Sequence, residues 1–465
     1  MSKTMLQDLI PRPVSAVATG ERLPVEVLRT IHVPFELRRH GDELVKAFHY
    51  FGKALRRVEA ESTDIILGLD GTLAAEGWKI EIGSAAIQLC GGSPAGVFYG
   101  VTALRQLLAL GYARGSETAV LDCGTIEDKP RFAWRGLMLD SVRHFQSKEK
   151  IKDVIRRIAD WRLNVFHWHL TDVQGLRLPF ARVPASDGPC YTRADLAEIA
   201  AFAAEHHVRI VPELDMPGHS NALLRHFPQY ACDPAHPGAE FCLGNPEARA
   251  FLKSLLAELM EFFPDSPIIH LGGDEADTTS WSTCPKCRAA LQHAGLSQMR
   301  ELENQFMNEM TRYVIAGGRR PMVWCTEAVH PADTLVQAWQ SILEIHRTHP
   351  RGNPMVNSVH YSCYFDYPAD STEPRLAWMP ELPEESVYQS FEPFAETLDR
   401  LCGTEACLWT EIVPEWRVVP KIVPRLAAFA ETAWIQADGK NWHDFQRRKR
   451  QLEAVGYWDL LQWQT

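Results

Sequence analysis

The sequence predicts a (β/α)8 barrel, a fold of the α/β class, preceded by a small α/β domain. The chain has 465 residues, which is more than one hydrophobic core usually supports, so two domains are expected. Beyond about residue 126, short apolar segments alternate with amphipathic ones, as strands and helices do around a parallel sheet. Eight such strands suit a barrel. A doubly wound sheet is the competing fold, but no glycine-rich phosphate loop follows the first strand.

The N-terminal domain is predicted to span residues 1–125. Trp78, Ile80 and Ile82 alternate with polar residues, as in a half-buried strand, and residues 87–89 continue as a second strand. Residues 95–110 then form an amphipathic helix. No catalytic pattern stands out, so we assign this domain a packing role.

The predicted barrel domain spans residues 126–465 and ends in a helix. Its expected strands are Gly136–Leu139, Asn164–His169, Arg209–Glu213, Ile268–Leu271, Pro321–Trp324, Thr334–Ala338, Met355–Ser358 and Glu405–Trp409. The helices between them include Lys148–Trp161, Arg193–His206, Pro246–Phe263, Gln298–Ile315 and Pro420–Ile435. We expect residues 363–404 to form a long, partly ordered loop, which in a barrel is usually functional. The closing helix is Trp442–Leu461.

The charge of the chain argues against nucleic acid or an anionic membrane as a partner. The net charge is −11, without long runs of one sign. No run approaches the roughly 20 apolar residues of a membrane span. Asp8 lies where a signal peptide would need an apolar core, so the sequence predicts a cytoplasmic location.

The eleven cysteines are scattered and odd in number, which favours reduced thiols over a disulfide framework. Cys284 and Cys287 form a CxxC pair without a second such pair at zinc-site spacing. We interpret this pair as the start of a helix, with metal or redox use as the alternative.

One stretch, residues 268–275, contains the strongest candidates for catalytic residues. Its apolar start predicts a buried strand, two glycines follow, and the stretch ends in Asp274 and Glu275. Neighbours on a strand point to opposite faces, so these carboxylates share a pocket only if the glycines break the strand geometry. Two carboxylates held together repel each other, which raises the pKa of at least one. The alternative is an acidic turn that caps the next helix.

Other polar and aromatic side chains follow the remaining predicted strands. The carboxyl ends of barrel strands meet at the face that carries the chemistry, so these side chains are expected to converge. In chain order they are Arg135, Asp140, Arg143, His144, His167, His169, Asp172, Glu213, Asp215, His219, Trp324, Gln337, Trp339, Tyr364, Asp366, Trp409 and Glu411.

The segment His270-x-Gly272-Gly273-Asp274-Glu275 resembles the His-x-Gly-Gly-Asp-Glu motif of glycoside hydrolase family 20, the β-N-acetylhexosaminidases. Further segments that resemble the family follow in order along most of the chain. The resemblance implies that Arg135 binds sugar hydroxyls and that Asp172 and His219 orient one another beside the acid. The other implied roles are walls around the acetamido group and ring (Trp324, Trp339, Trp409), a donor to the acetamido oxygen (Tyr364), and acceptors from sugar hydroxyls (Asp366, Glu411). We assign Asp215, His167 and Trp434 to structural roles.

The loop after the second barrel strand departs from the family pattern. Family members usually have Asp-Asp-Gln-Gly-Trp-Arg where this chain has Asp172-Val173-Gln174-Gly175-Leu176-Arg177. One carboxylate and one aromatic side chain are therefore missing. The departure leaves the Asp-Glu pair intact and affects leaving-group binding or loop packing.

The resemblance implies a substrate-assisted, retaining hydrolysis of terminal N-acetylhexosamines. The acetamido oxygen of the substrate attacks the anomeric carbon, Glu275 protonates the leaving oxygen, and Asp274 stabilises the charge on the acetamido nitrogen. No metal or organic cofactor takes part. Both GlcNAc and GalNAc remain open as the terminal sugar.

Two other functions compete with this reading. His167 and His169, with His219 and His270, could bind a divalent metal for amide hydrolysis. That use leaves Asp274, Glu275 and the tryptophans without a function. A catalytically inactive sugar-binding protein is the other alternative, and the presence of both carboxylates disfavours it.

Overall fold

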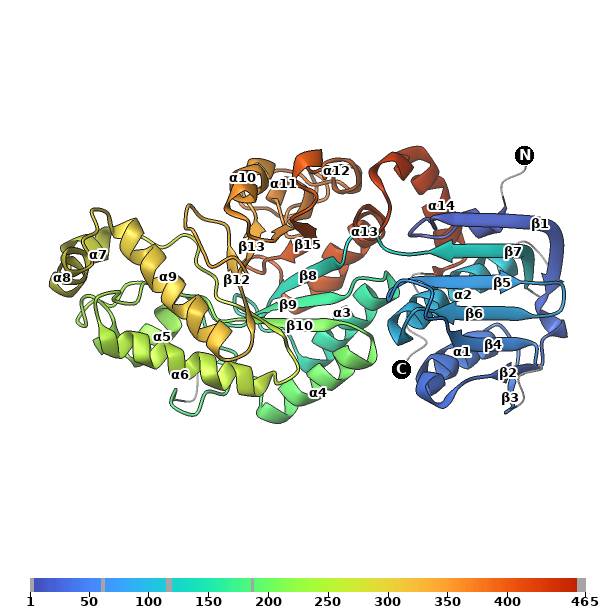
Figure 1. Ribbon diagram of the computed structural model, residues 1–465, viewed down its shortest axis with the longest axis horizontal. Coiled ribbons are helices and arrows are strands. Elements are labelled where there is room, and N and C mark those ends of the chain that lie inside the picture. The colour runs from blue at the N-terminus through green and yellow to red at the C-terminus, as the bar shows by residue number, and fades with distance from the viewer. Residues whose placement is uncertain (1–3, 60–62, 114–118, 185–187, 458–465) are drawn as a thin grey trace. The chain divides into compact units, whose positions relative to one another are not determined.

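The computed structural model describes residues 4–59, 63–113, 119–184 and 188–457, which form two compact units (Figure 1). The first consists of the described residues of Met1–Ala133, Arg157–Leu163 and Leu426–Thr465. The second consists of Trp134–Arg156 and the described residues of Asn164–Arg425. From the sequence we placed the boundary at residue 125 and assigned the C-terminal helix to the barrel.

The first unit is built on a seven-stranded sheet. Its strand order is β1 (Ser15–Pro24), β7 (Val120–Asp128), β5 (Trp78–Ile82), β6 (Ile87–Gly91), β4 (Ile65–Leu69), β2 (Thr30–His32) and β3 (Arg56–Arg57). Helix α2 (Pro94–Ala113) packs on this sheet, and α1 (Arg38–Tyr50) packs on α2. The strands and the helix predicted for residues 78–110 are therefore confirmed. Trp434 has the structural role we assigned to it, because its Nε1 donates to the buried carboxylate of Asp128 (3.0 Å).

The second unit is a closed barrel of eight parallel strands, as predicted. They are β8 (Trp134–Asp140), β9 (Val165–His169), β10 (Arg209–Glu213), β11 (Ile268–His270), β12 (Arg320–Trp324), β13 (Leu335–Ala338), β14 (Met355–Asn357) and β15 (Leu401–Leu408). Every predicted strand is present, and β15 begins four residues earlier than expected.

The predicted long helices are present. They are α3 (Lys148–Asp160), α4 (Arg193–Glu205), α6 (Pro246–Phe262), α9 (Met299–Ala316), α13 (Glu415–Trp434) and α14 (Trp442–Ala454). Helix α13 begins five residues before the predicted Pro420, and α14 already ends at Ala454. Residues 458–461 of the predicted closing helix lie outside the described residues. None of the helices in the described part of the chain is long and apolar enough to cross a membrane.

The shorter helices lie mainly in the connections of the barrel. They are α5 (Asn221–His226), α7 (Thr279–Thr283), α8 (Pro285–His293), α10 (Ile342–Thr348), α11 (His360–Cys363) and α12 (Glu384–Gln389). Single 3-10 turns occupy Met5–Gln7, Val25–Val27, Phe35–Leu37, Pro228–Tyr230, His349–Arg351, Ala395–Thr397 and Ala437–Gly439. The predicted loop 363–404 thus contains α12 and one 3-10 turn, and its last residues belong to β15.

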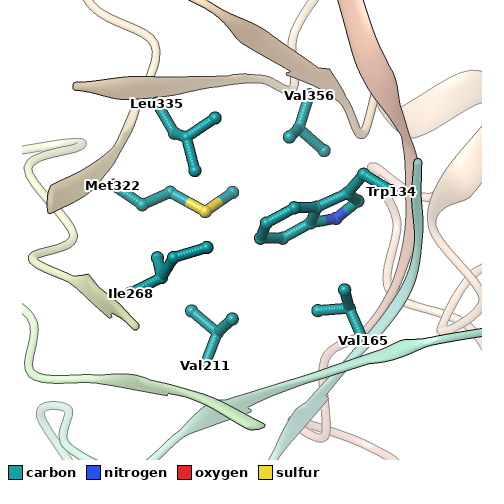
Figure 2. Packing of buried hydrophobic residues seen from close by; sticks show 7 residues of the cluster. All are labelled: Trp134, Val165, Val211, Ile268, Met322, Leu335 and Val356. Atoms are coloured by element: carbon teal, nitrogen blue, oxygen red, sulfur yellow. The ribbon is translucent and has the colours of Figure 1, made fainter. Parts of the chain in front are cut away.

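The barrel interior is filled in layers. Figure 2 shows an apolar layer around the indole of Trp134, made of side chains from seven of the strands: Trp134, Val165, Val211, Ile268, Met322, Leu335 and Val356. Two residues further along the strands, the interior becomes polar, with His167, Glu213, His270, Trp324, Gln337 and Glu405. A Cβ on Gly136 would lie 2.4 Å from Glu405 Oε2, so the glycine leaves room for this carboxylate. The polarity of the interior therefore increases toward the carboxyl ends of the strands.

Candidate active site

A cavity of about 430 Å³ opens at the carboxyl ends of the barrel strands. Eight of the eleven predicted site residues line it: Asp172, His219, Asp274, Glu275, Trp339, Tyr364, Trp409 and Glu411. These residues come from the segments after β9, β10, β11, β13, β14 and β15. The predicted convergence at this face is thus observed.

The turn after β11 brings both carboxylates to the cavity. Gly272 (φ 65°) and Gly273 (φ 101°) have positive φ, and so does Glu275 (φ 51°). A Cβ on Gly272 would lie 1.7 Å from Asp215 Oδ1, so no larger residue fits there without rearrangement. The glycines break the strand geometry as the sequence predicted. A positive φ at a non-glycine residue such as Glu275 is strained and is typical of functional sites.

The two carboxylates have opposite electrostatic environments. Burial raises the pKa of Asp274 to about 6 against the attraction of His219, and the negative charges of Glu213 and Glu275 add to the rise. The close approach of His219 lowers the pKa of Glu275, whose side chain is 58% exposed. The predicted rise in pKa therefore falls on Asp274 and not on Glu275.

His219 contacts Glu275, and a chain of hydrogen bonds holds His219 in place. His219 Nε2 lies 3.6 Å from Glu275 Oε2, and its Nδ1 donates to Asp172 Oδ1 (3.0 Å). The other oxygen of Asp172 accepts from His169 Nε2 (2.9 Å). Burial opposes the charge on His219, but its bonds to Asp172 and Glu275 raise its pKa to about 12. His219 is thus a cation next to Glu275, and the predicted pairing of Asp172 with His219 is present.

The histidines of the alternative metal site contact carboxylates within the barrel. His169 Nδ1 hydrogen-bonds to Glu213, and His270 Nδ1 lies 2.9 Å from the same carboxylate. His167 Nδ1 hydrogen-bonds to Glu405 (2.8 Å). All three rings are buried. Their ring nitrogens extend the network beneath His219.

Arg143 forms the charged end of the cavity. Its guanidinium lies 2.7 Å from Asp172, 3.3 Å from Asp140 and 4.0 Å from Glu411, and it stacks 5.0 Å from the centroid of Trp409. Burial raises the pKa of Glu411, while Arg143 opposes that rise. The Oε2 atom of Glu411 has no hydrogen-bond partner among the described residues. This carboxyl group can therefore accept a hydrogen bond from a ligand beside Arg143.

Aromatic rings also line the cavity. Trp339, Tyr364 and Trp409 line the cavity, and the centroids of Tyr364 and Trp409 are 6.4 Å apart. Trp378, which is 58% exposed, lies at the same cavity. A lining that combines flat apolar rings with charged groups suits a ligand with both an apolar face and hydroxyl groups.

Three predicted residues are not part of the cavity lining. Arg135 is fully buried near the amino end of β8, where its backbone pairs with Asn164, so its position contradicts the predicted contact with sugar. Trp324 lies inside the barrel with its Nε1 donating to Glu213, and its ring is 5.9 Å from that of Trp409. Asp366 is fully buried, and burial together with nearby Glu411 raises its pKa to about 8.

The sequence analysis placed Arg143, His169 and Asp215 at this face without including them in the predicted site, and all three line the cavity. Arg143 has the guanidinium that we had assigned to Arg135, and its signal was its place just beyond the strand, three residues after Asp140. Asp215, which we took as structural, lines the cavity and accepts from the Gly273 N–H (3.2 Å). His169, Gln340, His360, Tyr367 and Trp378 complete the lining.

The loop that departs from the family pattern is well packed. Leu176 is buried and pairs with Thr171 in an isolated β-bridge, while Val173 is partly exposed. Arg177 donates to the carbonyls of Ser141 (2.8 Å) and Val142 (2.5 Å), which fixes the loop to the end of β8. The two replacements thus leave Asp172 in position.

A second hollow, of about 700 Å³, adjoins the cavity. It shares Asp274, Glu275, Trp339 and Gln340 with the cavity, and Gln298, Arg300, Asn304 and Glu327 are among its other lining residues. The two carboxylates therefore lie between two open spaces.

Comparisons with known proteins agree with this geometry. Residues 132–437 match the catalytic domain of glycosyl hydrolase family 20, and residues 6–129 match domain 2 of that family. A β-hexosaminidase of Akkermansia muciniphila is 31% identical over 81% of this chain and 83% of its own length. A β-hexosaminidase of Vibrio furnissii is 28% identical over 79% of this chain and 67% of its own.

Comparison with solved structures also finds enzymes of this family. The exo-β-N-acetylglucosaminidase of Vibrio harveyi, crystallised with N-acetylglucosamine, superposes with a TM-score of 0.88 at 26% identity. The match covers 99% of this chain and 79% of the Vibrio harveyi chain. The chain therefore belongs to glycosyl hydrolase family 20 and is a glycoside hydrolase of the β-N-acetylhexosaminidase type.

Proposed function

We propose that the protein removes terminal, non-reducing N-acetylhexosamines from β-glycosides, with the acetamido group of the substrate as the nucleophile. The observation that carries this proposal is the place of Asp274 among aromatic rings. Its carboxylate shares a cavity with Trp339, Tyr364 and Trp409. An acetamido group has a methyl for the tryptophan faces, an oxygen for the Tyr364 hydroxyl and an N–H for Asp274. A sugar with only hydroxyl groups has no methyl group to pack against these rings.

In this proposal Asp274 and Glu275 act on different atoms. Asp274 accepts from the acetamido N–H and stabilises the positive charge that develops as the acetamido oxygen attacks the anomeric carbon. Its Oδ1 has no hydrogen-bond partner among the described residues and so is available to the substrate. Glu275 donates its proton to the leaving oxygen and then, as the carboxylate, accepts a proton from the attacking water.

The charged end of the cavity supports an exo mode of action. Arg143 and Glu411 lie 4.0 Å apart in the cavity lining, and in this proposal they bind the ring hydroxyls of the terminal sugar. An internal residue of a polysaccharide has one of these hydroxyls substituted, and the substituent would meet the charged pair. The adjoining hollow on the other side of Glu275 is the proposed place of the leaving group.

The proposal is tested with two matched aryl β-glycosides that carry the same phenol. The 2-acetamido substrate should be hydrolysed, while the 2-hydroxy analogue, which lacks the nucleophile, should scarcely react. A thiazoline mimic of the bicyclic intermediate should bind at least about 10²-fold more tightly than the product sugar, because the site complements the charged geometry.

The competing mechanism has Asp274 as a covalent nucleophile. It would turn over the 2-hydroxy analogue, and a 2-fluoro sugar would leave a covalent label on Asp274 in the digested protein. Either result would overturn the substrate-assisted proposal. Comparing the GlcNAc and GalNAc glycosides of the same phenol assigns the sugar.

A further inference from the structure

Four cysteines from two distant parts of the barrel unit come together in one cluster. Cys232 and Cys242 flank a loop after β10, and Cys284 and Cys287 begin α8. Three of the four are buried, Cys232 is partly exposed, and all four are free thiols. The reaction has no use for them, since none lines the cavity that holds Asp274.

The spacing of the sulfur atoms is that of a tetrahedral metal site. Cys232 and Cys287 are 3.7 Å apart, Cys242 and Cys284 are 3.7 Å apart, and Cys242 and Cys287 are 3.6 Å apart, measured between Sγ atoms. All four Sγ atoms lie within 4.8 Å of one another. Zn–S bonds of about 2.3 Å at tetrahedral angles place neighbouring sulfurs about 3.8 Å apart.

The backbone around the cluster favours thiolates. The Gly244 N–H donates to Cys287 Sγ (3.4 Å). A Cβ on Gly244 would lie 2.3 Å from the Lys286 carbonyl, so only glycine allows this approach. Cys284 is the N-cap of α8 and Cys287 lies in its first turn, where the helix dipole stabilises negative charge.

The cluster joins the two segments that carry the catalytic groups. The loop between Cys232 and Cys242 is bonded to the turn of His219, through Ser220 N to Ala239 O (2.8 Å) and Phe241 N to Pro217 O (2.9 Å). The segment from Glu275 leads through α7 to Cys284, and Trp281 of α7 donates to the Phe241 carbonyl (2.9 Å). A link at the cysteines therefore holds the segments of His219 and Glu275 together.

We propose that Cys232, Cys242, Cys284 and Cys287 bind one Zn²⁺ ion as a structural site. Each thiol loses its proton on binding, so the complex of four thiolates and Zn²⁺ has a net charge of −2. Lys286 and Arg288 are the neighbours of Cys287 in the sequence. The ion has no open coordination position for substrate and takes no part in hydrolysis.

The other uses of four thiols fit the geometry less well. Disulfides pair cysteines two by two at about 2.05 Å, whereas here Cys242 approaches both Cys284 and Cys287, and Cys287 approaches both Cys232 and Cys242. An iron–sulfur cluster needs room for several irons and sulfides between its ligands. Sulfurs that all lie within 4.8 Å of one another leave room for a single ion.

The first experiment measures metal in the full chain, purified without chelators under reducing conditions from zinc-supplemented medium. Elemental analysis should find one zinc per chain, and a mercurial that titrates the thiols should release it. Protein reconstituted with Co²⁺ should show the absorption bands of a tetrahedral tetrathiolate site. Wild-type protein without zinc, with iron in its place, or with a mass that shows two disulfides overturns the proposal.

The second experiment assigns the ligands. The double variant Cys284→Ser/Cys287→Ser should lose the zinc and unfold at a lower temperature. The control Cys190→Ser removes a partly exposed thiol elsewhere in the same unit and should keep both the zinc and the unfolding temperature. If the double variant does not fold, thiol titration of the wild-type chain decides, since the proposal requires four thiols to be protected by each zinc released. Zinc retained by a folded double variant contradicts the assignment.

Discussion

Glu275 is held as a carboxylate in the free protein, although its proposed task requires a proton. Its partner His219 is a cation at neutral pH, and the close approach of His219 lowers the pKa of Glu275. The side chain is also 58% exposed, so water further stabilises the charge. A sugar that fills the cavity would remove this water, and burial raises the pKa of a carboxyl group. Substrate binding should therefore raise the pKa of Glu275 and favour its protonated form.

The variant Glu275→Gln tests this role at the residue scale. Glutamine keeps the shape and removes the proton donor, so general acid catalysis worth about 10² to 10⁴ in rate should be lost. The loss should be greatest for aryl substrates whose phenol is a poor leaving group, and small for acidic phenols that leave without protonation. The measurement is kcat/KM across a series of phenols. A loss that is equal across the series would mean that Glu275 has a different function.

A single residue also shows where inference from sequence reaches its limit. Arg135 is the second residue of the first barrel strand and Arg143 lies three residues beyond its end, and the sequence analysis chose Arg135 for the site. In a strand, successive side chains alternate between the two faces. Trp134 points into the barrel, so Arg135 points away from it near the strand's amino end. Arg143 lies beyond the carboxyl end, where barrel sites form. Counting from the strand end would have favoured Arg143.

At the scale of elements, the turn after β11 depends on Gly272. Replacing it with alanine places a Cβ 1.7 Å from Asp215 Oδ1 at a backbone with φ 65°. Asp215 or the turn must move, and the turn carries Asp274 and Glu275. Gly272→Ala should therefore lose most of its activity and lower the free energy of unfolding by more than the roughly 1–2 kcal/mol of a left-handed alanine.

Gly295→Ala is the matched control for this prediction. Gly295 has nearly the same φ (66°), but nothing lies within 4 Å of its added Cβ. The Gly295→Ala variant should lose only the backbone contribution to the free energy of unfolding, about 1–2 kcal/mol, and should keep its activity. Chemical denaturation and kcat/KM of both variants provide the comparison. Equal effects in the two variants would show that the contact with Asp215 does not matter.

The elements that the sequence predicted well are those with buried apolar faces. Strands such as β10 and helices such as α6 have uninterrupted or periodic apolar residues, because they pack inside or against the barrel. The short helices α7 and α12 were not predicted, since their positions are fixed by contacts distant in sequence, such as Trp281 with Phe241. The start of α8 was predicted correctly from the CxxC pair, because Cys284 is the N-cap of that helix. The cysteine cluster was missed for the same reason, because Cys232 and Cys242 are far from the CxxC pair in sequence.

At the scale of the whole molecule, the barrel holds many charges in its interior. Glu213 and Glu405 share hydrogen bonds with His167, Trp324 and Gln337, so their charges are compensated. Asp274 differs, because burial raises its pKa to about 6 in spite of His219. A group whose pKa is higher in the folded than in the unfolded state makes folding less favourable once it ionises. The site therefore has a cost in stability that depends on pH.

The variant Asp274→Asn should remove this cost and so stabilise the molecule while it impairs catalysis. The ordinary pKa of 3.8 and the folded value of about 6 define the pH window. Below about pH 4 the carboxyl group is protonated in both states and the variant gains nothing. Between about pH 4 and 6 the wild type loses stability relative to the variant, and above about pH 6 the difference is full, at about 1–3 kcal/mol.

Unfolding temperatures measured from pH 4 to 8 provide the comparison, with exposed Asp265→Asn as the control that should show no such trend. A variant that is less stable than the wild type at pH 7, or a difference that does not change with pH, would show that His219 compensates the charge of Asp274 fully in the folded protein.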